Sequence, residues 1–163
     1  MDVLARRVGE ALGARGLMLA TAESCTGGLI AQRVTSVPGS SRWFDRGFVT
    51  YSNEAKQDML GVTASLLLEH GAVSEAVVTA MARGALLASK ATASVAVSGV
   101  AGPGGGTASK PVGTVCLAWC VPGTEAQARR LHLEGDRDAI RQQASELALQ
   151  GLLESLDSGP CGM

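Results

Sequence analysis

Apolar residues recur along the chain at two different spacings, and the way these spacings take turns predicts an α/β protein. Leu4, Val8 and Leu12 lie four residues apart with charged residues between them, which predicts an amphipathic helix over residues 2–14. Short runs of apolar, β-branched or aromatic residues are typical of buried strands. Three such runs occur in the first hundred residues, at 17–20, 43–51 and 93–98.

Helical spacing returns after the first two of these runs. Helices are predicted over residues 28–37, 53–60, 63–69 and 75–89. Ser52 and Ser74 stand directly before two of them, where a serine hydroxyl caps the first free backbone N–H groups. Because helices alternate with strands, we expect a mixed, mostly parallel sheet with helices on both faces.

The last third of the chain predicts a different arrangement. Residues 112–121 and 126–133 are two apolar runs on either side of a turn at Pro122-Gly123, which predicts an antiparallel hairpin. Gly135-Asp136 then caps a final helix. The fold class that we expect is a single-domain, three-layer α/β/α sandwich whose mostly parallel sheet carries a C-terminal antiparallel hairpin.

The bulk composition fits one domain and argues against two kinds of partner. The chain has 163 residues, and we assign residues 1–156 to a single domain and residues 157–163 to a disordered tail. A formal charge of -1 and an aromatic content of 3% offer no footprint for nucleic acid. No apolar run approaches the roughly 20 residues that span a membrane, and the N-terminus is unlike a signal peptide, so a cytoplasmic location is expected.

The cysteines and histidines do not form a metal-binding pattern. None of the four cysteines belongs to a CxxC pair, and the two histidines lie far apart in the sequence. Cys116 and Cys120 fall in one predicted strand, where a spacing of four puts them on the same face. We therefore expect reduced, buried thiols, no bound metal and no cofactor.

Small polar residues gather between the first strand and the helix that follows it. From Thr21 to Gly28 the chain reads Thr-Ala-Glu-Ser-Cys-Thr-Gly-Gly. Open α/β proteins bind their ligands at such strand ends. Two interpretations stand side by side: a hydroxyl of Ser24 or Thr26 merely caps the next helix, or the segment carries the reactive groups of an active site.

A tyrosine and a lysine mark the next junction between a strand and a helix. Tyr51 ends the aromatic strand, and Lys56 lies about one turn into the following helix. A lysine that points back over the strand end becomes buried, so its pKa falls and it can serve as a base toward a serine hydroxyl. Ser–Lys pairs are a known alternative to Ser-His-Asp, although Lys56 also fits a solvated helix surface.

Two further segments suit an anion. Residues 99–109 form a glycine-rich loop whose backbone N–H groups fit a phosphate or an oxyanion, or else only make a turn. The loop is neither a Walker A loop nor a GxGxxG motif. Arg137 and Arg141 share a face at the start of the last helix, which fits either an anion site or a charged entry in which Asp138 pairs with Arg141.

Taken together, these segments resemble the C-terminal-domain family of competence-damage protein A. The matching strings, in order between Thr21 and Asp138, are TAESCTGG, WFDRGFVTYSNEAK, HGAVSE, SGVAGPGGG, KPVGTV and GDRD. Stand-alone members of this family are nicotinamide-mononucleotide amidases, and the chain resembles the stand-alone form. The resemblance implies hydrolysis of nicotinamide mononucleotide to nicotinate mononucleotide and ammonia in pyridine nucleotide recycling, by a homo-oligomer that uses no metal.

The resemblance also implies roles for single residues. Ser24 would be the nucleophile, Lys56 its general base, and Tyr51 a partner that relays or orients the proton. An amide substrate with a phosphate needs oxyanion donors and a phosphate cradle as well. The candidates for these contacts are Thr26, Gly27, Gly28, Gly102, Gly104, Gly105, Thr107 and Arg137. Which loop takes the phosphate and which takes the oxyanion stays open.

Two alternatives accompany this hypothesis. Cys25, next to Ser24, is a rival nucleophile on chemical grounds because thiolates attack well. The chain also fits a non-catalytic nucleotide-binding or regulatory module, since the glycine loops and Arg137 suit an anionic ligand without turnover.

Overall fold

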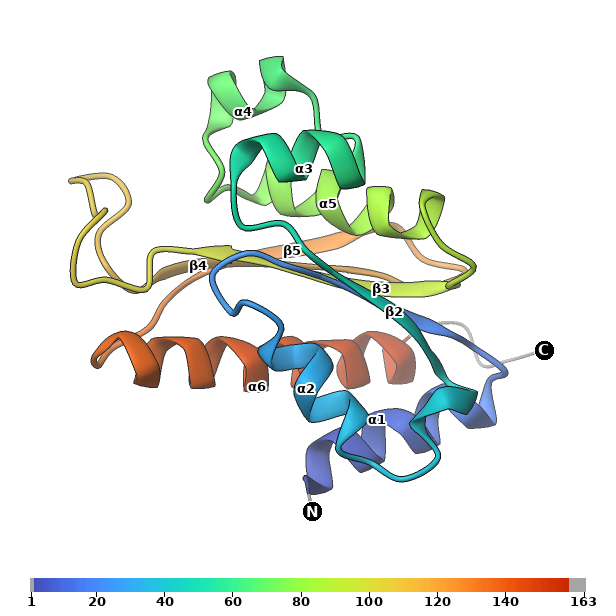
Figure 1. Cartoon of the computed structure of the whole chain (residues 1–163). Helices are drawn as coiled ribbons and strands as arrows, with labels where there is room; N and C mark the ends of the chain where they lie inside the picture. The colour runs from blue at the N-terminus through green and yellow to red at the C-terminus, as the bar shows by residue number, and fades with distance from the viewer. Residues whose placement is uncertain (1, 159–163) are drawn as a thin grey trace.

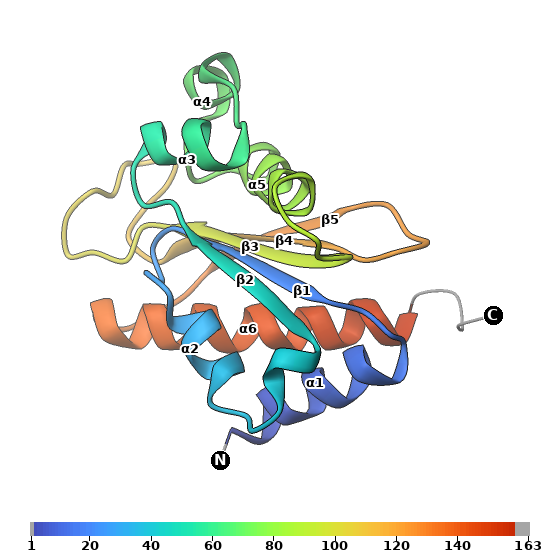
Figure 2. The same cartoon turned by 45° about the vertical axis from the view of Figure 1, so that its right-hand side comes forward.

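The computed structural model describes residues 2–158, which fold into three layers (Figure 1). The helices are α1 (Val3–Ala14), α2 (Leu29–Thr35), α3 (Asn53–Leu60), α4 (Ala64–His70), α5 (Glu75–Leu87) and α6 (Arg137–Ser158), with a short 3-10 helix at Ser40–Arg42. The strands are β1 (Leu19–Glu23), β2 (Phe44–Val49), β3 (Ala93–Gly99), β4 (Thr114–Cys120) and β5 (Gln127–His132). Helices α3, α4 and α5 cover one face of the sheet, and α1, α2 and α6 cover the other (Figures 1 and 2).

The strands form one mixed sheet in the order β2-β1-β3-β4-β5. β1 runs parallel to both of its neighbours, whereas β4 pairs antiparallel with β3 and β5. The central strands β1 and β4 are buried along their whole length because helices cover both faces of the sheet. The predicted sandwich, its mixed sheet and its C-terminal hairpin are therefore confirmed.

A separate hydrophobic core lies on each face of the sheet. One core packs α1, α2 and α6 against the strands, with Leu12 and Leu149 among its members. The other packs α3, α4 and α5 against the opposite face and contains Met81, Cys116 and Cys120. The prediction that these two cysteines are buried on one face of their strand is confirmed.

Side-chain caps begin three of the helices where the sequence predicts them. Ser52 Oγ accepts a hydrogen bond from the backbone N–H of Ala55 at 3.0 Å, and Asp136 Oδ1 accepts one from Ala139 at 2.8 Å. Ser74 Oγ accepts from the third N–H of α5 at 3.2 Å. Each cap satisfies a donor that the helix itself leaves free.

The boundaries of the first strand are wrong in the sequence-based prediction. The strand runs from Leu19 to Glu23 rather than over residues 17–20. Thr21 and Glu23 are polar, so a prediction based on hydropathy ends the strand before them. Both side chains are nevertheless fully buried in the centre of the sheet. As a result only residues 24–28, here called the β1–α2 loop, connect the strand to α2.

Smaller differences occur at other element ends. β2 stops at Val49 and α2 spans Leu29–Thr35, so both are shorter than predicted. Helix α6 continues through Ser158, and the first two residues of the predicted disordered tail are therefore helical. The rest of that tail, residues 159–163, lies outside the described residues. None of the helices in residues 2–158 combines the length and apolar character needed to cross a membrane.

The topology places a crevice at the carboxyl ends of β1 and β3. The chain leaves β1 toward α2 on one face of the sheet and leaves β2 toward α3 on the other face (Figure 1). Along the sheet, the connection from β1 leads to β2 and the connection from β3 leads the opposite way to β4, so β1 and β3 form a topological switch point, where ligands bind in open α/β sheets. Ser24 follows β1 directly and Thr50 follows β2, and Thr50 donates its backbone N–H to the carbonyl of Glu23 at 2.8 Å.

Candidate active site

A serine and a lysine meet in this crevice. The Nζ atom of Lys56 lies 2.9 Å from Ser24 Oγ, although the two residues are 32 positions apart in the sequence. Ser24 is placed by the end of β1, and its backbone N–H donates to the carbonyl of Val97 on β3 at 3.0 Å. Lys56 comes from the first turn of α3. The predicted Ser–Lys juxtaposition is thus present in the structure.

Lys56 is buried, with only 1% of its surface exposed, so the alternative of a solvated surface lysine is wrong. Its Nζ atom also contacts the backbone carbonyls of Thr50 at 2.9 Å and Tyr51 at 3.1 Å. Desolvation lowers the pKa of Lys56 below its ordinary value. A neutral amine has two N–H groups for the two carbonyls and one lone pair, which can accept the Ser24 hydroxyl proton once that hydroxyl turns away from the Tyr51 carbonyl.

The thiol of Cys25, which is next to Ser24, is less reactive than an ordinary cysteine thiol. Burial raises the pKa of Cys25 to about 11, because a thiolate loses its hydration there. A thiol with this pKa carries almost no thiolate near neutral pH. The structure therefore favours Ser24 over Cys25 as the nucleophile.

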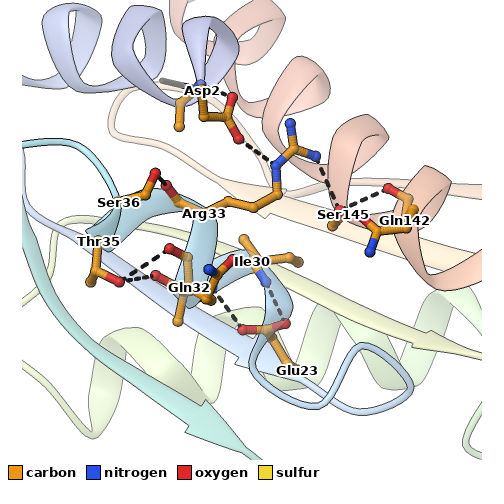
Figure 3. A network of polar contacts seen from close by, with 11 residues as sticks. Asp2, Glu23, Ile30, Gln32, Arg33, Thr35, Ser36, Gln142 and Ser145 are labelled. Carbon is orange, nitrogen blue, oxygen red and sulfur yellow. Dashed lines mark hydrogen bonds and ion pairs between the residues drawn. The ribbon is translucent and has the colours of Figure 1, made fainter. Parts of the chain in front are cut away.

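A buried carboxylate, and not a hydroxyl of the loop, caps α2 (Figure 3). Glu23 accepts hydrogen bonds from the backbone N–H groups of Ile30 at 2.9 Å and Ala31 at 3.0 Å. The Thr26 hydroxyl donates to the same carboxylate at 2.6 Å. The interpretation of Thr26 or Ser24 as the helix cap is therefore wrong, and the Thr26 side chain is engaged inside the protein.

Arg141 of α6 holds the β1–α2 loop from the opposite side. Its Nε donates to the carbonyl of Cys25 at 3.0 Å, and its Nη2 donates to the carbonyl of Thr26 at 3.1 Å. The sequence suggests for Arg141 either an anion site or a pairing with Asp138, and neither describes this contact. Arg141 binds main-chain carbonyls, and it makes no ion pair with Asp138 within residues 2–158. Sequence reasoning missed this role since the contact joins segments more than a hundred residues apart.

Gly27 and Gly28 allow the backbone of the β1–α2 loop to adopt a left-handed conformation. Gly27 and Gly28 have φ values of 60° and 105°, in the left-handed region that side chains disfavour. The N–H of Gly27 donates to the Ser24 carbonyl at 3.1 Å, so this group is already occupied. Of the predicted oxyanion donors in this loop, the N–H groups of Thr26 and Gly28 have no acceptor in the described part of the chain.

Tyr51 and Arg137 meet at the rim of the crevice. The Arg137 guanidinium donates to the Tyr51 hydroxyl at 3.2 Å and to the Gly102 carbonyl at 2.8 Å. Tyr51 is 61% exposed, and its phenol makes no hydrogen bond to Ser24 or Lys56 within residues 2–158. Tyr51 reaches the serine only through its backbone carbonyl, which accepts from Ser24 Oγ at 3.4 Å, so the structure gives no direct contact for a proton relay through the phenol.

The glycine-rich loop, defined here as residues 100–113, projects beyond the sheet at the same edge (Figures 1 and 2). Its base is held by Arg137 at Gly102 and by Lys110, whose Nζ donates to the His70 carbonyl at 2.6 Å. Arg130 donates to the Ser109 carbonyl. The residues at its tip, including three of the candidate substrate contacts, are exposed: Pro103, Gly104, Gly105, Gly106, Thr107 and Ala108.

A cleft of about 220 Å³ lies at this edge of the sheet. Its lining contains the predicted Ser24, Lys56, Tyr51 and Arg137, together with Cys25, Asn53, Ala72, Val73, Ser98, Gly99 and Ala101. The candidate contacts Thr26, Gly27, Gly28, Gly102, Gly104, Gly105 and Thr107 are not part of this lining. Sequence reasoning missed the polar lining residues Asn53 and Ser98, although each stands at an element end on this edge of the sheet.

The described residues were also compared with the requirements of a metal site. Within the described residues no group of three or more His, Cys, Asp or Glu side chains is arranged to hold a metal ion. The expectation of a reaction without metal or cofactor stays a prediction.

The fold and the site together define an α/β protein with a buried Ser–Lys pair at a topological switch point. The CinA C-terminal domain matches residues 1–156, and the chain belongs to this family. The chain is 56% identical over 149 residues to nicotinamide-nucleotide amidohydrolase PncC of Escherichia coli K12, covering 91% of this chain and 90% of that one. It is 54% identical over 154 residues to a PncC protein of Pseudomonas putida, with 94% and 96% covered.

Solved structures agree with this assignment. The competence/damage inducible protein CihA of Agrobacterium tumefaciens superposes with a TM-score of 0.91 at 47% identity, covering 96% of this chain and 95% of that one. Such a likeness extends over both layers of helices and the whole sheet.

Proposed function

We propose that the chain is a nicotinamide-nucleotide amidase that hydrolyses the carboxamide of nicotinamide mononucleotide to nicotinate mononucleotide and ammonia. The observation that carries the proposal is the 2.9 Å contact between the buried Lys56 Nζ and Ser24 Oγ. The names of the relatives in Escherichia coli and Pseudomonas putida support the substrate class. The predicted place in pyridine nucleotide recycling follows from this reaction.

The first half of the reaction is attack by the serine. Ser24 Oγ bonds to the carboxamide carbon while its proton moves to Lys56 Nζ, and the C=O electron pair moves onto the oxygen. The tetrahedral intermediate then collapses, its C–N bond breaks, and the leaving nitrogen takes the proton from Lys56. Ammonia departs and a nicotinoyl ester remains on Ser24.

The second half returns the enzyme to its starting state. Water attacks the ester carbon and gives a proton to Lys56, which passes it back to Ser24 Oγ as the ester bond breaks. The product is the carboxylate, nicotinate mononucleotide. Lys56 acts as base and then acid in each half, which requires that it start neutral; the desolvation that lowers its pKa favours this form.

The cleft lining supports an assignment of the substrate's parts. The side chains of Ala72, Val73 and Ala101 offer an apolar wall for the pyridine ring. Arg137 at the rim offers a guanidinium to the phosphate. Tyr51 orients Arg137 through its hydroxyl, which replaces the predicted proton relay in this proposal.

The test is an assay of ammonia release from nicotinamide mononucleotide by the purified protein. Wild type is expected to release ammonia, Ser24→Ala to lose the activity, and Cys25→Ala to stay within tenfold of wild type. Full activity in Ser24→Ala would contradict the mechanism. Tight binding of nicotinamide mononucleotide by wild type without turnover would contradict the proposed function and support a non-catalytic nucleotide-binding module instead.

A further inference from the structure

Arg141 contacts the β1–α2 loop in a way that the reaction scheme above does not use. Its guanidinium is partly buried between α6 and the loop, and it binds two successive main-chain carbonyls, those of Cys25 and Thr26. It makes no ion pair with a carboxylate in the described part of the chain. Its positive charge is therefore committed to the backbone next to the nucleophile.

These two contacts determine how successive peptide planes are turned. In a trans peptide the C=O and the next N–H point in opposite directions. Because Arg141 holds the Cys25 carbonyl, the N–H of Thr26 points away from α6. Because it also holds the Thr26 carbonyl, the N–H of Gly27 is turned the same way, and it donates to the Ser24 carbonyl at 3.1 Å.

The last contact orients a third peptide plane. With the Ser24 carbonyl taken by Gly27, the N–H of Cys25 must point away from that hydrogen bond. The N–H of Cys25 has no acceptor on another residue within residues 2–158. Ser24 and Cys25 both line the cleft. A donor that no other residue uses thus follows the nucleophile directly, as expected of a group that binds a developing oxyanion.

We propose that Arg141 is a positioning residue that presets the N–H group of Cys25 to bind the oxyanion formed on attack by Ser24. This inference rests on the proposed function for its substrate but not for its geometry. An arginine suits the role because its planar fork donates to two carbonyls at once, whereas a lysine offers a single point of attachment.

The experiment compares Arg141 with another arginine at the surface of α6. Arg33 of α2 binds Asp2 at 2.6 Å and Ser145 of α6 at 3.0 Å, and it does not contact the β1–α2 loop (Figure 3). The variants are Arg141→Gln, Arg141→Lys and Arg141→Ala, with Arg33→Gln as the matched control. Thermal unfolding of each variant establishes that the fold is retained.

With nicotinamide mononucleotide, the kcat of Arg141→Gln is expected to fall about 10²-fold, as when an oxyanion donor is lost, while KM changes by less than about threefold. Arg141→Lys is expected to lie between this variant and wild type. Guanidinium added below denaturing concentrations should restore part of the kcat of Arg141→Ala. Arg33→Gln should keep its kcat even where its stability falls.

A second readout keeps the inference separate from the proposed function. A fluorophosphonate probe reacts with an activated serine: the Ser24 Oγ–P bond forms as the hydroxyl proton moves to Lys56 Nζ, the P–F bond breaks, fluoride leaves, and the phosphoryl oxygen occupies the oxyanion position. Wild type that is labelled at Ser24 but does not hydrolyse nicotinamide mononucleotide would overturn the proposed function alone. Arg141 variants labelled as fast as wild type, or a loss in kcat equal to that of Arg33→Gln, would overturn the positioning role.

Discussion

The β1–α2 loop and the glycine-rich loop both leave a parallel strand at the same edge of the sheet, yet they are held very differently. In the first, Ser24, Cys25 and Thr26 are buried, and side chains from β1, α3 and α6 bind the loop. In the second, Arg137, Lys110 and Arg130 hold the loop near its ends, while the tip is exposed. The two loops look alike in sequence because both are rich in glycine.

This difference teaches what each loop is suited to do. Reaction at Ser24 needs atoms fixed to a fraction of an ångström, and the dense contacts of the β1–α2 loop supply that order. An exposed loop held only near its ends suits contact with a substrate or solvent and not the positioning of a nucleophile. Breaking the first loop is therefore expected to change kcat, and changes at the rim of the second are expected to change KM.

The largest effect is expected at the Ser–Lys pair. Lys56→Met removes the base and should lower kcat at least about 10⁴-fold, as should Ser24→Ala, because the two act as one unit. The double variant should be no slower than either single one. Since Lys56 is buried at a cost in desolvation, Lys56→Met should unfold at or above the wild-type temperature at neutral pH. A strongly additive loss in the double variant would contradict the coupling.

The pH dependence of wild type sharpens the role of Lys56. The reactive form is the neutral amine, so kcat/KM should rise with pH through a pKa below the ordinary lysine value and fall about tenfold per pH unit beneath it. Stability should rise with pH from this lowered pKa up to the ordinary lysine pKa, because in that range the unfolded chain binds a proton that the folded chain has lost. A flat activity profile between about pH 6 and 9 would contradict the assignment.

A smaller effect is expected at the rim shared by the two loops. Arg137→Gln removes a charge-assisted contact to the phosphate and should raise KM for nicotinamide mononucleotide roughly 10- to 100-fold, with a smaller change in kcat. Nicotinamide riboside, which lacks the phosphate, is the matched substrate, and its kcat/KM should be unaffected by the substitution. An equal loss of kcat/KM with both substrates would contradict a contact between Arg137 and the phosphate.

The same substitution in the two loops gives the smallest expected effect. Gly27→Ala forces a side chain into a backbone with φ of 60° and should cost about 1 kcal/mol of stability. Gly104→Ala adds a methyl group in open space at a position without positive φ, so its stability and kcat should match wild type. Chemical denaturation measures both; equal destabilisation of the two variants would show that the loops are equally constrained.

The sequence predicts the scaffold better than the contacts within the site. Strands and helices alternate strongly enough to identify the parallel sheet, and Ser24 and Lys56 are predicted to meet because each follows a parallel strand at one edge. The caps at Ser52, Ser74 and Asp136 depend only on neighbouring residues, so they are predictable as well.

The remaining contacts depend on tertiary structure. Glu23 lies inside a buried strand, where hydropathy favours no carboxylate, and its role appears only when α2 is placed beside it. The contact of Arg141 with Cys25 and Thr26 and that of Tyr51 with Arg137 join distant parts of the chain. The homo-oligomer and the cytoplasmic location, which no contact within one chain tests, stay predictions.

The most direct test of the Ser24–Lys56 mechanism is rapid-quench mass spectrometry of the wild-type protein mixed with nicotinamide mononucleotide. The mechanism predicts a transient adduct, the nicotinoyl nucleotide ester, on the peptide that contains Ser24 and Cys25, with fragmentation placing it on the Ser24 oxygen. The adduct should be absent in Ser24→Ala. An adduct on the Cys25 sulfur, or turnover without an adduct in an assay able to detect a single acylated site, would contradict the account.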